Sequence, residues 1–229
     1  MIHWWERIDR QDEVAHALNV ARNGGRLVLA GSDAKGVSQT LKLIQEALTL
    51  QRIEYVLAEV NTIAPTKKSH LLSLWKAVRP KDPGSSSIPR WAAFSNADPG
   101  TVVDEMVADL TSVPPRAAVA IFPFIDRFRS IEQWEASRLL RLSNETGLGL
   151  IVAAKAEEPW STLGSCTTFR LKNFFRSDIV ECLANRTDGE WLSSSEQARL
   201  VDLVVSAADN VGSINPMDAY SILAAEAAL

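Results

Sequence analysis

The sequence predicts an α/β fold: a doubly wound parallel sheet followed by a small C-terminal helical lid. Short apolar runs without polar alternation recur up to residue 171, and segments of helical periodicity separate them. Right-handed crossovers would then cover both faces of the sheet with helices. From about residue 175 only helical patterns occur. We therefore predict an α/β core over residues 1–172 and a lid over residues 173–229.

Each predicted element is an apolar run or a helical stripe between turn residues. The predicted strands cover 26–31, 52–61, 116–125, 148–155 and 166–171. The predicted helices begin near 9 or 12 and end at 23, then cover 37–50, 66–78, 99–110, 130–147, 177–185, 193–212 and 215–229. Asp9 or Asp12 is expected to cap the first helix. Residues 79–91, rich in Pro, Gly and Ser, are predicted to form a loop.

The composition excludes several classes of function. The 229 residues are 46% hydrophobic, carry a net charge of -4 and have a pI of about 5.5, which argues against nucleic acid as the main ligand. The N-terminus does not resemble a signal peptide, and no apolar run reaches the roughly 18 residues that a membrane span needs. We expect a cytoplasmic protein that does not bind membranes. Cys166 and Cys182 are expected to be reduced, mostly buried thiols. The three scattered histidines suggest no metal site.

A glycine motif separates the first predicted strand from the second helix. Gly31 and Gly36 have the G-x-x-x-x-G spacing of a phosphate-binding loop, and Ser38 stands at the position of its hydroxyl residue. Val37, however, replaces the lysine that neutralises phosphate, and Lys35 is the only local substitute. Two interpretations follow. Either these residues bind ATP or ADP weakly, or the glycines serve the backbone of a strand–turn–helix junction that binds no nucleotide.

The order of the parts resembles the AAA+ and STAND-type P-loop ATPases. The segments that carry this resemblance are the Arg-x-x-Glu motif in "WERIDRQDEVAHAL", the Walker A-like "LVLAGSDAKGVSQTL", the Walker B-like "AAVAIFPFIDRF", the sensor-1-like "GLGLIVAAKAEEP", the last strand and turn in "TTFRLKNFFRSDIVECL", and the lid segment "ADNVGSINPMDAYSIL". The resemblance covers nearly the whole chain and implies a P-loop NTPase core with a helical lid.

The departures from the family pattern concern its catalytic residues. If residues 125–128 match the family's "hDRh" segment, Pro123 and Phe124 occupy the positions of the two Walker B acids. Neither can bind magnesium through water or polarise an attacking water. Asp126 is the nearest carboxylate that could replace them. Together with Val37, these replacements indicate a degenerate member of the class that does not hydrolyse ATP.

The family pattern also includes a polar sensor-1 residue and a lid arginine, and neither stands out in this sequence. Ala154 or Lys155 falls where the resemblance places the polar sensor-1 residue, and Arg199 is a candidate lid arginine by position only.

The resemblance and its departures together favour a non-catalytic function. We expect an adaptor or regulatory subunit that acts through protein–protein assembly, as a homo- or hetero-oligomer, with a bacterial signalling or defence complex as the implied setting. Trp4 and Trp5 precede the first helix and are candidate partner contacts. Two alternatives remain open. One is an ATP-binding switch with slow or no hydrolysis, and the other is a replication regulator or clamp-loader-like subunit that binds DNA or replication proteins.

Overall fold

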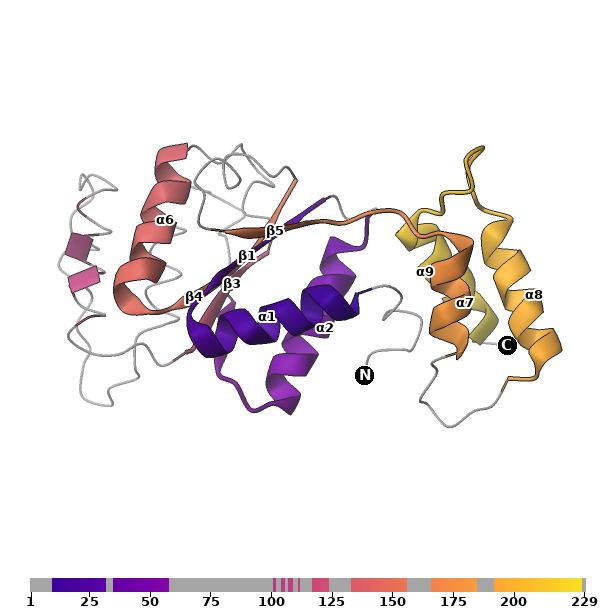
Figure 1. Ribbon diagram of the computed structural model, residues 1–229, viewed down its shortest axis with the longest axis horizontal. Helices are drawn as coiled ribbons and strands as arrows, with labels where there is room; N and C mark the ends of the chain where they lie inside the picture. Colours follow the sequence, from indigo (N-terminus) through magenta and orange to yellow (C-terminus); the bar gives the residue numbers. More distant parts are fainter. Residues whose placement is uncertain are drawn as a thin grey trace.

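A five-stranded sheet with the strand order β2-β3-β4-β1-β5 forms the centre of the molecule (Figure 1). The computed structural model describes residues 10–31, 35–57, 117–123, 133–155, 166–184 and 192–227, together with 101, 104, 105, 107, 108 and 111. The strands are β1 (Arg26–Ala30), β2 (Tyr55–Leu57), β3 (Val119–Phe122), β4 (Gly149–Ala154) and β5 (Thr167–Arg170). Every pair of neighbouring strands is parallel. The predicted parallel sheet is therefore confirmed.

Helices follow the strands in the predicted order. They are α1 (Gln11–Asn23), α2 (Val37–Leu50), α6 (Gln133–Thr146), α7 (Arg176–Ala184), α8 (Ser194–Val205) and α9 (Pro216–Ala227). The prediction that an aspartate caps α1 is wrong for Asp12, which lies in the first turn. Arg10 occupies the N-cap, and its side chain forms no capping hydrogen bond. The helix predicted for 193–212 ends at Val205, before a turn. Asp9, the predicted helix 66–78 and the loop 79–91 lie outside the described residues.

The connections between strands place helices on both faces of the sheet. The chain moves across the sheet in one direction from β1 to β2 and in the opposite direction from β3 to β4. Because such crossovers are right-handed, α2 and α6 must lie on opposite faces, as Figure 1 shows. Alternate strand residues on each face are buried, for example Leu27 and Leu29 on one and Val28 on the other. The sheet is thus doubly wound.

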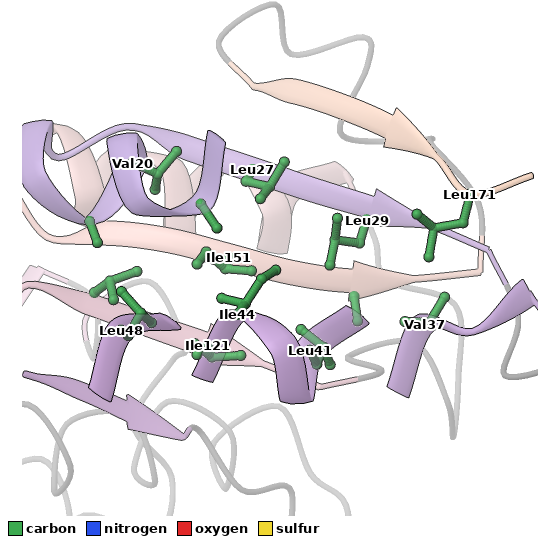
Figure 2. Close-up of a cluster of buried hydrophobic side chains, with 14 residues drawn as sticks. Val20, Leu27, Leu29, Val37, Leu41, Ile44, Leu48, Ile121, Ile151 and Leu171 are labelled. Atoms are coloured by element: carbon green, nitrogen blue, oxygen red, sulfur yellow. The ribbon is translucent and has the colours of Figure 1, made fainter. Parts of the chain in front are cut away.

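The main hydrophobic core lies between the sheet and the pair α1 and α2 (Figure 2). Leu41, Ile44 and Leu48 are buried there, which confirms the inner face predicted for α2. Val37 lies at the end of this row, at the first turn of the helix. The burial of Val37 shows that the apolar stripe of α2 continues into the glycine motif.

We call Asn173, Phe174 and the helices α7, α8 and α9 the helical unit, and it has a hydrophobic cluster of its own. Its fully buried members include Phe174, Ile179, Val204 and Ile214. The unit lies beyond the carboxyl ends of the strands, where the chain leaves β5 (Figure 1). The division of the chain at residue 172 remains a proposal.

No helix in the described part of the chain combines the length and the apolar character that a bilayer span requires. Cys166 and Cys182 form no disulfide, and each is half-buried rather than mostly buried as predicted. Burial raises the pKa of the Cys166 thiol above its ordinary value, so that this side chain is protonated at neutral pH.

Candidate functional site

The candidate site is the junction between β1 and α2, at the edge of the sheet where ligands bind in open α/β folds. The chain leaves β1 toward β2 and leaves β4 toward β5, in opposite directions across the sheet. The neighbouring carboxyl ends of β1 and β4 therefore form a topological switch point. Gly31, Lys35 and Gly36 are the described residues of the segment after β1, and we call them the glycine turn.

Gly31 begins the turn between two flanking strands. Its N–H donates a hydrogen bond of 2.9 Å to the carbonyl of Ala154, and the N–H of Leu171 donates one of 2.9 Å to the carbonyl of Ala30. A Cβ at Gly31 would lie 3.2 Å from Cγ2 of Val37. A larger residue here would therefore force the side chain of Val37 to shift by a few tenths of an ångström.

Gly36 ends the turn for a different reason. Its φ of 79° lies in the left-handed region, which L side chains rarely adopt, and it occupies the N-cap of α2. Its carbonyl accepts hydrogen bonds of 2.9 Å from both the N–H and the hydroxyl of the buried Thr40. Ser38 lies half-buried in the first turn of the helix. The packing of Val37 against Gly31 and the left-handed backbone of Gly36 thus account for both glycines without a ligand.

Val37 occupies the lysine position and faces the sheet. Its side chain is fully buried in the cluster that includes Leu29, Leu41 and Leu171. Figure 2 shows Val37 beside Leu41, in line with the other inward side chains of α2. An apolar side chain in this position gives no charge to a bound phosphate.

Lys35, the predicted substitute cation, contacts the helical unit. Its Nζ donates a hydrogen bond to Oδ1 of Asn173, just before α7. The amide of Asn173 in turn donates a hydrogen bond of 2.6 Å to Oγ of Ser213. One of the three N–H donors of this ammonium is thus used within the protein.

No carboxylate directly follows a strand in the described part of the chain. Pro123 comes immediately after β3, and Lys155 comes immediately after β4. Phe124 and Asp126 lie outside the described residues. In the same part of the chain, no group of three or more His, Cys, Asp or Glu side chains comes together as a metal site.

Arg10 is a component of this site that the sequence reasoning did not single out. It is 2% exposed, and its Nη2 donates hydrogen bonds to the carbonyls of Lys35 (3.1 Å) and Lys172 (3.4 Å). Its Nη1 lies 3.8 Å from a carboxylate oxygen of Glu13, in an i,i+3 pair. The Arg-x-x-Glu motif was a usable signal, because this pair is its arginine and its glutamate.

The remaining predicted positions do not join the junction. Arg199 forms an exposed ion pair of 2.6 Å with Glu226, within the helical unit. Trp4 and Trp5 lie outside the described residues, so their predicted partner contacts remain a prediction. The structure thus brings together Gly31, Lys35 and Gly36 with Arg10.

Comparison with known proteins identifies the fold. No protein-family model matches the sequence, and a search of the curated proteins finds no match. Among solved structures, a STAND (Signal Transduction ATPase with Numerous Domains) protein with a tetratricopeptide repeat sensor from Pyrococcus horikoshii matches with a TM-score of 0.52 at 12% identity, over 86% of this chain and 28% of that one. Drosophila ORC, in a structure bound to DNA, matches with a TM-score of 0.51 at 13% identity, over 85% of this chain and 54% of that one.

The chain has a P-loop NTPase-like fold. The STAND ATPase and ORC match over most of this chain, so the resemblance in the sequence is confirmed at the level of fold. The chain spans about a quarter of the STAND protein and about half of the ORC chain.

Two described positions lack the charge that a bound nucleotide and magnesium would need. Val37 is apolar and buried in the core, and proline follows β3, while the Lys35 ammonium is hydrogen-bonded to Asn173. In the described part of the turn, Gly36 has a left-handed backbone conformation, and the Lys35 side chain is hydrogen-bonded within the protein.

Proposed function

We propose that this chain is a non-catalytic AAA+/STAND-like module, an adaptor or regulatory subunit that acts by assembling with other proteins. The observation that carries the proposal is the complete burial of Val37 in the sheet core. A P-loop enzyme stabilises the transferred phosphoryl group mainly through its lysine and its metal. An apolar side chain that is buried between α2 and the sheet cannot supply this charge.

The surroundings of Val37 support the same proposal. Lys35 is the nearest cation in the turn, and it is hydrogen-bonded to Asn173. Pro123 stands where the first Walker B acid is expected. We infer that the loss of charge at Val37, Pro123 and Phe124 reflects one change, from nucleotide chemistry to a structural use of the fold.

Assembly with other proteins is the function class that such a fold retains when its chemistry is lost. The similar STAND protein carries a tetratricopeptide repeat sensor beside its ATPase module. A bacterial signalling or defence complex, in a cytoplasmic setting, is the context that the resemblance implies. The net charge of -4 argues against nucleic acid as the principal partner.

Calorimetric titration with ATP and ADP, with and without magnesium, tests the non-catalytic part. We expect no heat of binding, and no nucleotide released when the purified protein is denatured. The alternative of an ATP-binding switch predicts binding that Lys35→Ala weakens, whereas our proposal predicts identical titrations for both proteins. Lys42→Ala is a matched control, because Lys42 is exposed on α2. Tight binding that depends on Lys35 would overturn the proposal.

Sedimentation velocity over a range of concentrations tests the assembly part. We expect a concentration-dependent oligomer, or a monomer that forms a complex of defined stoichiometry with a purified partner, in either case unchanged by ATP. Assembly that appears only with ATP and magnesium would contradict a nucleotide-independent adaptor.

A further inference from the structure

The joint between the α/β core and the helical unit is held by a buried arginine. Arg10 precedes α1, yet its guanidinium hydrogen-bonds to the glycine turn at Lys35 and to the segment after β5 at Lys172. Three distant stretches of the chain therefore meet at one side chain. A charged donor on two carbonyl groups forms stronger hydrogen bonds than a neutral donor does.

The same guanidinium also contacts the helical unit. Its Cζ lies 5.0 Å from the centre of the Phe174 ring, within the range of a cation–π interaction. Phe174 is fully buried and meets the Tyr220 ring edge-on at 5.7 Å. Arg10 thus connects the glycine turn to the aromatic centre of the helical unit.

A second row of contacts crosses the joint beside the first. Lys35 hydrogen-bonds to Asn173, and Asn173 hydrogen-bonds to Ser213. Phe174 and Ile214 exchange two backbone hydrogen bonds, of 2.9 and 2.8 Å, which join the start of the unit to the loop before α9. Lys35 therefore contacts a segment, residues 173–174, that is hydrogen-bonded to the loop before α9.

The glycine turn is covered by the last helix of the unit. A Cβ at Gly36 would lie 3.2 Å from Oη of Tyr220 and 3.5 Å from Cβ of Pro216. Side chains of α9 therefore contact the turn where it enters α2.

We propose that these contacts form a latch, centred on Arg10, that holds the helical unit closed on the glycine turn without a bound nucleotide. In this arrangement the protein's own side chains join the two parts. The latch goes beyond the proposed function, because it concerns the mechanics of the joint and could exist whether or not a nucleotide binds elsewhere.

Distance measurement between two spin labels tests the latch. Lys42→Cys on α2 and Ala224→Cys on α9 are exposed positions, and Cys166→Ser with Cys182→Ser removes the native thiols. We expect one narrow distance distribution in the full chain without nucleotide. In Arg10→Gln, the open population should rise about tenfold or more, because two charge-assisted hydrogen bonds and the ring contact are lost.

Arg22→Gln is the matched control. Arg22 lies in α1, and its exposed side chain hydrogen-bonds to Gln51 after α2 rather than to the helical unit, so the distribution should stay narrow. If circular dichroism shows that Arg10→Gln is unfolded, Asn173→Ala replaces it. This variant removes the hydrogen bonds of Asn173 to Lys35 and Ser213 but leaves the contacts of Arg10 in place, so it should broaden the distribution less.

Two results would overturn the latch. One is a broad distribution in the parent protein, and the other is an unchanged narrow one in every folded latch variant. A broad distribution that narrows with ATP and magnesium would refute the latch and the nucleotide-independent function together. A narrow distribution in a protein that binds ATP by calorimetry would support the latch and refute only the nucleotide-independent function.

Discussion

The glycine turn has two sides that are built in opposite ways. On the side of the sheet, Val37 packs against Gly31 and Leu171 in a fully apolar cluster. On the side of the helical unit, Lys35 and Gly36 meet Asn173 and the Tyr220 ring through a charge-assisted hydrogen bond and a close contact. One short segment thus contributes both to the core and to a joint.

The difference separates contacts that stabilise the core from contacts that join the core to the helical unit. Apolar burial is non-directional and belongs to the folded core, so the sheet side should persist in any folded state. Hydrogen bonds across a joint are directional and exchange readily with water, so the side of the helical unit can open without unfolding the core. Substitutions on the two sides should therefore differ in magnitude and in what they disturb.

Val37→Lys, which restores the lysine of an active P-loop, should have the largest effect. We expect the free energy of unfolding to fall by roughly 3 kcal/mol, because an ammonium would enter an apolar cluster without a partner. Urea denaturation measures this loss. Val211→Lys is the control, since Val211 is 80% exposed and the change there should stay within about 0.5 kcal/mol. Unchanged stability together with new ATP binding would show that position 37 faces a ligand instead.

Gly36→Ala should have the next largest effect. The left-handed conformation costs an alanine about 1 to 2 kcal/mol, and the new Cβ would also crowd Tyr220. Gly212→Ala separates the two causes, because Gly212 has a φ of 77° but a Cβ there would meet no atom within 4 Å. We expect Gly36→Ala to be the more destabilising in a thermal melt. Equal losses of stability in the two variants would indicate that a Cβ at position 36 does not clash with α9.

Ser193→Ala should have a smaller effect, confined to the helical unit. Ser193 and Glu196 form a capping box at the start of α8, and loss of an N-cap hydroxyl typically costs about 1 kcal/mol. Hydrogen exchange should show faster opening of α8 and unchanged protection of β1 and β4. Ser177→Ala is a suitable control, because Ser177 is an exposed serine within α7. Equal loss of protection in the sheet would mean that core and helical unit open as one.

The smallest expected effect is a pH dependence of the stability that this capping box gives to α8. Hydrogen bonds from Ser193 lower the pKa of Glu196 below its ordinary value. The stabilisation is therefore fully present above the unfolded-state pKa, about 4.3, and is lost as the pH falls through the lower folded-state pKa. When the pH is lowered from neutral to this acidic range, the melting temperature should fall slightly less for Glu196→Gln than for the parent. A larger fall of the melting temperature in the variant would contradict the lowered pKa of Glu196.

Much of the fold was predictable because it depends on local patterns. The inner face of α2 at Leu41, Ile44 and Leu48 follows from helical spacing, and the buried β4 follows from an uninterrupted apolar run. Helix starts were less predictable: α1 begins after Arg10 rather than at an aspartate cap, because the tertiary contacts of this arginine outweigh local capping preference.

The sequence by itself determined the order of strands and helices, the two glycines and the missing lysine, because spacing and side-chain type along the chain specify these features. Only the tertiary structure decided which way Val37 points and what Lys35 contacts. Lys35 and Asn173 are 138 positions apart, and they meet because the strand order places β5 beside β1. A contact of this kind depends on how the whole sheet is assembled, and no local pattern near residue 35 encodes it.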